Sequence, residues 1–279
     1  MSTVEIARSV ARAAHVLREA NAVVVAAGAG MGVDSGLPDF RGDRGLWTQR
    51  SLAGLGAGSL RLFSPSGLAG EPHLAWGVFV KVRRLFQAAT PHAGFQHLRS
   101  LCARAGRAFV FTSNVDGHFQ RAGFDPQRIV ECHGSMDFAQ CAARCRPGVF
   151  PLVEPRVDEA EGGPRARDPL PRCPTCGAVA RPNVVLFGDH QFDGARVDEQ
   201  RRRLLSFQDE IARDPRLRLV VVECGAGTTI ATVRHFSEQL VQGGRGTLVR
   251  LNPTEPAVPP GHVSIPLGAR EGLAALAAA

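Results

Sequence analysis

The sequence predicts an α/β fold with a parallel sheet flanked by helices. Short apolar runs alternate with helical patterns, the first run ends in a glycine-rich turn, and two segments interrupt the alternation. The chain has 279 residues, 44% hydrophobic and 21% charged, which excludes a disordered chain and suits one large or two small domains.

The repeating elements begin at the N-terminus. The first 20 residues predict a helix, which Ser2 or Thr3 can cap with Glu5 completing a capping box. The apolar run 23–27 is typical of a strand buried on both faces of a parallel sheet. Similar runs follow at 108–112, 184–187, 219–222 and 247–251. Helical patterns occupy 93–105, 194–213 and 229–242.

Two segments do not fit this alternation. Residues 42–90 are rich in Gly, Ser and Leu, with one helical stretch near 72–88. Residues 136–181 contain four cysteines and seven prolines but little apolar material, so we expect a metal to hold this segment together. Both segments therefore interrupt the alternating fold, the first with a helix and the second with a metal-stabilised stretch.

The net charge of +7 comes almost entirely from arginine, since Lys81 is the single lysine. This bias weakens the charge as evidence for nucleic acid, and we expect no direct nucleic-acid partner. No apolar run approaches the roughly 18 residues that span a membrane. The first residues show no basic region followed by an apolar block, so we expect no secretory signal. Seven cysteines, an odd number, do not suggest a disulfide framework. We expect a cytoplasmic protein with no membrane partner.

The glycine-rich turn after the first strand, Gly28-Ala29-Gly30, has the pattern of a dinucleotide site. Glycines permit a tight turn and let backbone amides approach a pyrophosphate. Val33 stands at the third glycine position, so a plain strand-to-helix turn is the alternative interpretation. The segment that follows favours the nucleotide, because it supplies an acid, an aromatic ring and an arginine that can meet phosphate: Asp39, Phe40 and Arg41.

Four cysteines predict a structural zinc site. Three residues separate Cys141 from Cys145, and two separate Cys173 from Cys176, within the range of tetrahedral four-cysteine sites. Such a closed set leaves no open position for catalysis. The alternatives are accidental thiols or a redox pair at 173 and 176. The remaining cysteines lie among apolar residues and are predicted to be buried: Cys102, Cys132 and Cys224.

Polar residues follow two of the predicted strands. Asn114 and Asp116 come after the strand at 108–112, and His133 follows the run 128–132. Ligands bind outside the carboxyl ends of strands in open α/β sheets, so these side chains should meet in one crevice. A histidine there can act as a general base near neutral pH. The other eight histidines have no such setting and are interpreted as structural.

Taken together, the motifs resemble those of the sirtuin family of NAD-dependent protein deacylases, in its bacterial form. They occur in the family's order over residues 22–276: Gly28-Ala29-Gly30, 35–42, 114–117, 120–123, His133-Gly134-Ser135, the two cysteine pairs, 181–189, Gly227-Thr228-Thr229 and Leu251-Asn252. The resemblance implies a large Rossmann-type NAD-binding domain, residues 1–41, 91–135 and 182–279, and a smaller domain formed by a helical insertion, 42–90, and a zinc-binding insertion, 136–181. It also implies NAD as co-substrate, one structural zinc ion, and acylated lysines of proteins as substrates. Its implied products are nicotinamide, O-acyl-ADP-ribose and free lysine.

The resemblance also implies residue roles. Thr228 or Thr229, beside Gly227, would hold the pyrophosphate with the amides of 28–30. Phe40 and Arg41, in the motif that includes Asp39, would close over the nicotinamide ribose. Asn114 would position the ribose or a water, Asp116 would bind the nicotinamide amide, and His133 would be the base. Asn252 would contact the adenosine ribose. The substrate peptide would add as a strand beside Val185, Phe187 and Gly188.

Some positions depart from the family pattern. Ser113 replaces a ribose-contacting Gln, Gly32 replaces Ser and Asp189 replaces Glu. The chain has no tyrosine, and the helix near 76–86 carries Phe79 and Val82 where the desuccinylase branch has its Tyr and Arg. This favours acetyl or another neutral acyl group. The alternatives are an ADP-ribosyltransferase or NAD glycohydrolase on the same scaffold, and a non-catalytic module that binds nucleic acid.

Overall fold

The computed structural model describes residues 2–38, 61–160 and 162–279. At its centre lies a parallel sheet of six strands in the order β11-β10-β9-β1-β2-β3. Every residue of β1 and β9 is buried, as expected for central strands covered on both faces. The strands are β1 Ala22–Ala27, β2 Ala108–Thr112, β3 Ile129–Glu131, β9 Leu219–Cys224, β10 Gly246–Leu251 and β11 Val263–Ile265.

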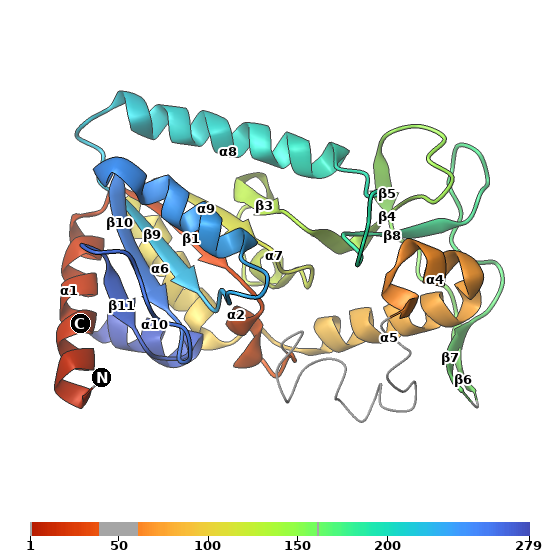
Figure 1. Ribbon diagram of the computed structural model, residues 1–279, viewed down its shortest axis with the longest axis horizontal. Helices are drawn as coiled ribbons and strands as arrows, with labels where there is room; N and C mark the ends of the chain where they lie inside the picture. The colour runs from red at the N-terminus through yellow and green to blue at the C-terminus, as the bar shows by residue number, and fades with distance from the viewer. Residues whose placement is uncertain (1, 39–60, 161) are drawn as a thin grey trace.

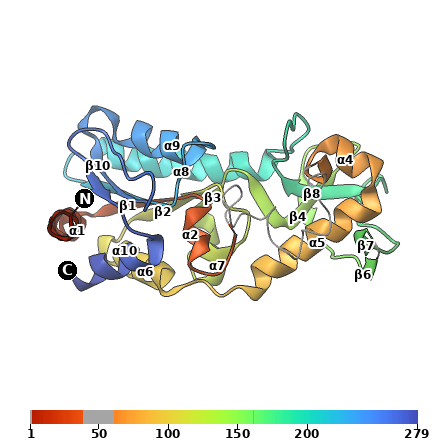
Figure 2. The ribbon, with the colours of Figure 1, turned by 60° about the horizontal axis from the view of Figure 1, so that its bottom comes forward.

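Helices cover both faces of this sheet (Figures 1 and 2). One face packs against α1 Thr3–Glu19, α6 Ala93–Ala105 and α10 Ala269–Ala278. The other packs against α8 Ala195–Arg213 and α9 Thr232–Val241. The predicted capping box of α1 is confirmed, since the Ser2 hydroxyl accepts from the Glu5 amide and the Glu5 carboxylate accepts from the Ser2 amide. The shorter helical segments are α2 Gly30–Val33, α7 His118–Arg121, η2 Pro126–Arg128 and η3 Gln242–Gly244.

The strand order reverses between β1 and β9. From β1 the chain proceeds outward through β2 to β3, whereas from β9 it proceeds the other way through β10 to β11. The connections that leave the two central strands therefore diverge, and a crevice opens at their carboxyl ends. The glycine-rich turn lies at this point, directly after β1.

A second unit lies at the opposite end of the molecule (Figure 1). It contains an antiparallel sheet in the order β5-β4-β8, a β6–β7 hairpin and two helices. The indole of Trp76 donates to the Ala180 carbonyl over 3.1 Å, and Gly77 permits a close approach, because a Cβ there would lie 2.1 Å from the Pro164 oxygen. Its elements are α4 Pro65–Gly70, α5 Pro72–Ala88, β4 Gly134–Cys141, β5 Val149–Pro151, β6 Val157–Ala160, β7 Gly163–Ala166 and β8 Ala180–Val184.

One predicted strand is wrong. The apolar run 184–187 does not join the parallel sheet; the strand is β8, which ends at Val184 and pairs antiparallel with β4. Val184 and Leu186 point into the core beneath α5, while Val185 and Phe187 stay exposed, so the run serves the second unit. The predicted domain boundaries remain a prediction. Among the described helices, none is long and apolar enough to cross a membrane.

Candidate active site at the carboxyl ends of the sheet

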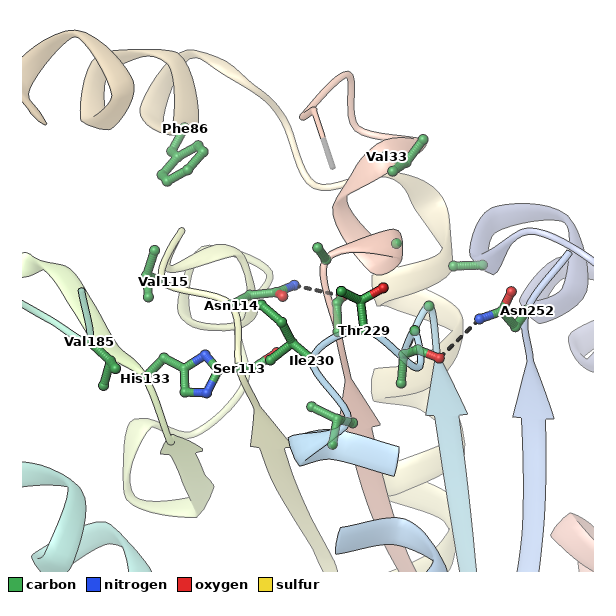
Figure 3. A pocket seen from close by; sticks show the side chains of 18 of the residues that line it. Val33, Phe86, Ser113, Asn114, Val115, His133, Val185, Thr229, Ile230 and Asn252 are labelled. Atoms are coloured by element: carbon green, nitrogen blue, oxygen red, sulfur yellow. Dashed lines mark hydrogen bonds between the residues drawn. The ribbon is translucent and has the colours of Figure 1, made fainter. Parts of the chain in front are cut away.

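A cavity of about 810 Å³ opens where the strand order reverses. Its walls come from the segments that follow β1, β2, β9 and β10, and from α5, β4 and the segment after β8. Figure 3 shows side chains from these separate segments around one space. The cavity lining includes many of the residues singled out from the sequence: Gly28, Ala29, Gly30, Ser113, Asn114, His133, Val185, Phe187, Gly227, Thr229 and Asn252.

The glycine-rich turn brings two loops into contact. The Gly28 and Gly30 amides donate to the Cys224 and Gly225 carbonyls, over 3.0 and 3.1 Å. A Cβ on Gly28 would lie 2.6 Å from the Gly225 oxygen, and Gly225 itself has a φ of +61°, so both positions need glycine. These two amides are thus engaged within the protein, and their predicted contact with a pyrophosphate stays a prediction.

Asn114 is held against this turn. Its side-chain amide donates to the Gly28 carbonyl over 3.0 Å, and its backbone amide donates to the Thr112 hydroxyl over 3.0 Å. The side chain is buried, and Ser113 precedes it on the cavity wall. The end of β2 therefore fixes an amide group between the turn and the cavity, as Figure 3 shows.

Asp116 lies beside the cavity rather than on its lining. Its carboxylate accepts a hydrogen bond from the His118 amide over 2.8 Å. Burial raises the pKa of Asp116 to about 6, although that hydrogen bond and the charge of Arg121 oppose the rise. Burial likewise lowers the pKa of His118 to about 4, so this imidazole is neutral behind Asp116. Asp116 is thus a partly buried acid that is costly to ionise.

His133 connects the two units, since it lies between the end of β3 and the start of β4. Its ring faces the cavity near Ser113 and Val185 (Figure 3). Burial, and then the charge of Arg201, lower the pKa of His133 below 6.5. The imidazole is therefore neutral at pH 7 and has a lone pair available to accept a proton.

The end of β10 supplies the opposite wall. Asn252 donates to the Ala226 carbonyl over 3.0 Å, and its side-chain oxygen accepts from the amides of Thr254 and Glu255. Thr228 does not line the cavity, whereas Thr229 does. The carboxylate of Glu255 lies on the cavity wall and bonds Thr228. Sequence reasoning missed Glu255, although its place three residues after Asn252 was a usable signal.

The segment after β8 is arranged as an exposed edge. The Val185 amide donates to the His133 carbonyl and the Phe187 amide to the Phe63 carbonyl, each over 2.9 Å. Their side chains are 42% and 41% exposed, which leaves them accessible to a partner. The turn that follows is held by the buried Asp189, whose carboxylate bonds Arg181 and the Leu186 amide. Burial would raise the pKa of Asp189, but Arg181 and these hydrogen bonds hold it below its usual value.

The four predicted cysteine ligands come together. The sulfur pairs Cys141–Cys176 and Cys145–Cys173 are each 3.6 Å apart, and all four sulfurs lie within 4.8 Å of one another. A tetrahedron with zinc–sulfur bonds of about 2.3 Å has edges of about 3.8 Å, so the set fits one zinc ion. Hydrogen bonds from the Cys176 and Thr175 amides lower the pKa of Cys173 to about 6, which favours a thiolate ligand.

Two sets of sequence predictions remain, those for the other three cysteines and those for residues 39–41. The three other cysteines are buried, as predicted. Burial raises the pKa of Cys102 and of Cys132 to about 12, so both thiols are protonated. The predicted cofactor contacts of Asp39, Phe40 and Arg41 lie outside the described residues.

Comparison with known proteins identifies the family. The Sir2 family model matches residues 28–203. The chain belongs to the Sir2 family. An NAD-dependent protein deacylase of Methylococcus capsulatus is 38% identical over 176 residues, covering 62% of this chain and 64% of that relative, which is less than two thirds of its length. An NAD-dependent protein deacylase of Thermus thermophilus is 32% identical over 265 residues, covering 93% of this chain and 91% of its own.

Solved structures agree with this assignment. An ADP-ribose complex of a mutant Sir2 homologue is 25% identical, with a TM-score of 0.68 over 96% of this chain and 94% of that one. A Sir2 homologue in complex with NAD shares the fold at 24% identity, with a TM-score of 0.68 over 96% and 92% of the two chains. The predicted family and fold class are thus confirmed.

Proposed function

We propose that this Sir2-family chain removes acyl groups, acetyl above all, from lysine side chains of proteins, with NAD as co-substrate. The observation that carries the proposal is the convergence of His133, Asn114 and Asn252 on one cavity, although they follow three different strands. Relatives named NAD-dependent protein deacylases and deacetylases support the same activity. The cavity, at about 810 Å³, has room for a dinucleotide together with part of a peptide.

NAD bound in this cavity supplies an electrophilic ribose carbon and nicotinamide as the leaving group. The chain supplies the surroundings. In the proposed binding mode, Asn252 contacts the adenosine ribose and the loop 227–229 holds the pyrophosphate, while Asn114 and Ser113 contact the nicotinamide ribose. This mode is supported by the cavity lining, which includes Ser113, Asn114, Gly227, Thr229 and Asn252. Asp116, beside this end, receives the nicotinamide amide. His133 is neutral at pH 7 and accepts a proton from a ribose hydroxyl at its ring nitrogen, which makes that oxygen a nucleophile toward the acyl carbon.

The substrate peptide adds as a strand along the segment after β8. Extended peptides bind in this way through backbone hydrogen bonds, which require little side-chain specificity. Val185 and Phe187 present exposed side chains there, and the Val185 carbonyl accepts from the acyl-lysine amide. The Asp189–Arg181 pair holds the turn beyond that segment in place.

The acyl group enters an apolar part of the cavity. Phe79, Val82, Phe86 and Met136 line it from α5 and β4. Among the described lining residues there is no lysine or arginine, so an acidic acyl group would lose its hydration without gaining a partner. This favours acetyl and other neutral acyl groups over succinyl.

Two further parts of the proposal concern organisation. We propose that residues 1–41, 91–135 and 182–279 form the nucleotide-binding domain, and that 42–90 and 136–181 form the smaller one. We also propose a cytoplasmic location, since a four-thiolate zinc site requires reduced cysteines.

A panel of peptides that carry acetyl-, butyryl- and succinyl-lysine, incubated with the chain and NAD, tests the function. Mass spectrometry should detect deacylated peptide and O-acyl-ADP-ribose in equal amounts, most for acetyl and least for succinyl. Free ADP-ribose or ADP-ribosylated protein without deacylated peptide would contradict the proposal and favour the glycohydrolase or transferase alternative.

A further inference from the structure

Thr228 stands between two residues that line the cavity, Gly227 and Thr229, and is bonded to an acid that also lines it, Glu255. Its backbone amide donates to one carboxylate oxygen of Glu255 over 2.9 Å, and its hydroxyl donates to the other over 2.5 Å. The hydroxyl contact and the amide contact lower the pKa of Glu255 below its usual value. The carboxylate is therefore ionised at pH 7 and occupies both donors.

The backbone of Glu255 is fixed independently of this contact. Its amide donates to the Asn252 side-chain oxygen over 2.9 Å, and its carbonyl accepts from the guanidinium of Arg234 over 2.6 Å. Arg234 is buried and also donates to the Ala226 carbonyl over 3.2 Å. The same two side chains thus clamp the loop after β10 to the loop after β9, and Glu255 stays within reach of Thr228.

The absence of a side chain at Gly227 leaves room for the Glu255 carboxylate. A Cβ on Gly227 would lie 3.3 Å from a Glu255 carboxylate oxygen, closer than most such contacts. A carboxylate presents two anionic oxygens to an amide and a hydroxyl, as a phosphate would. A pyrophosphate that used the same donors would face the carboxylate at close range, and two like charges at that distance repel each other.

We propose that Glu255 is an internal stand-in for the pyrophosphate: it occupies Thr228 in the nucleotide-free chain, and NAD must displace it to bind. Glu255 thereby sets the affinity for the nucleotide. This inference rests on the proposed function, because it takes the loop 227–229 as the pyrophosphate site.

Titration calorimetry with ADP-ribose and with adenosine tests this proposal. Glu255→Gln keeps the shape of the side chain and removes its charge, so the variant should bind ADP-ribose about three- to tenfold more tightly than the unmodified chain. Adenosine has no phosphate, and its Kd should not change. Asp209→Asn is the matched control, because it removes one negative charge from an exposed position on α8, and it should change neither Kd.

A second variant locates the effect. In a Thr228→Ala background the hydroxyl contact with Glu255 is gone and only the backbone amide contact remains, so the tightening caused by Glu255→Gln should be smaller than in the unmodified chain. Unchanged or weaker binding of ADP-ribose by Glu255→Gln would overturn the proposal, and weaker binding of both ligands would assign Glu255 to the ribose instead. If neither the unmodified chain nor any variant binds ADP-ribose, the proposed nucleotide site itself is wrong, and the inference about Glu255 fails with it.

Discussion

The six-stranded sheet and the cysteine-bearing unit, residues 134–184, are stabilised in different ways. In the sheet, helices on both faces bury large apolar clusters, and the central strands contain no exposed residue. In the cysteine-bearing unit, β5 and β6 have no buried residue. Its apolar side chains share one cluster with those of α5, a helix that lies outside this range. The sheet is therefore stabilised by packing, whereas we expect residues 141–176 to be stabilised by a metal bound to the four cysteines.

The proposed base, His133, lies where these two regions meet. His133 directly precedes β4, where the chain enters the cysteine-bearing unit, and Val185 directly follows β8, where the chain leaves it. The Val185 amide bonds the His133 carbonyl over 2.9 Å, so the two connections are tied together. A disturbance of the metal site should therefore reach the active site, while the sheet remains folded.

Loss of the metal should have the largest effect. Cys173→Ser removes one of four thiolates, and we expect the zinc content to fall from one equivalent toward zero, with deacylation lost. Hydrogen exchange should rise in residues 136–181 and stay low in β1 and β9, because structural zinc contributes about 10–16 kcal/mol in small zinc domains. Cys102→Ala is the control, since this thiol lies outside the cluster and the variant should keep its zinc.

A cavity in the sheet core should show the opposite pattern. Leu98 on α6 is fully buried, and Leu98→Ala should lower the free energy of unfolding by about 2–5 kcal/mol. Zinc content, measured per folded chain, should stay at one equivalent. Loss of zinc in this variant would show that the two regions do not hold their structures separately.

A substitution at Asp116 should have a smaller effect, and it should raise the free energy of unfolding instead of lowering it. Burial raises the pKa of Asp116 from its usual 3.8 to about 6 in the folded chain, so the ionised carboxylate lowers the stability fully above pH 6 and not at all well below pH 3.8. Asp116→Asn should raise the free energy of unfolding by roughly 1–2 kcal/mol at pH 7.5, with most of that gain lost at pH 4. Turnover should fall if Asp116 binds the nicotinamide amide, as proposed above. A variant that is no more stable at pH 7.5 would contradict the burial of this charge.

The pH dependence of turnover should reflect His133. Only the neutral imidazole accepts a proton, and its pKa lies below 6.5, mainly through burial. Activity should therefore hold as the pH falls to 6.5 and decline at lower pH, as the imidazole becomes protonated. A rate that falls as the pH rises above 6.5 would contradict this expectation, because it would require the histidine to act in its protonated form.

Local patterns predicted most elements and the metal site. Periodicity and spacing reveal features whose residues lie close together in sequence. Examples are the buried run 23–27, the helix 93–105 and the two close pairs formed by the four cysteines. The run 184–187 has the same apolar character, yet its pairing with β4 depends on contacts far along the chain. Glu255 is one acidic residue in a loop, and only the position of Thr228 beside it gives it significance.

Product analysis of the His133→Ala variant tests the central claim most directly. With NAD and an acetyl-lysine peptide, the unmodified chain should release deacetylated peptide and O-acetyl-ADP-ribose. His133→Ala should slow deacetylation by about 100-fold or more, while its thermal midpoint and zinc content stay unchanged. His190→Ala, at an exposed position, should retain full activity. Undiminished deacetylation by His133→Ala would contradict the assignment of this histidine as the base.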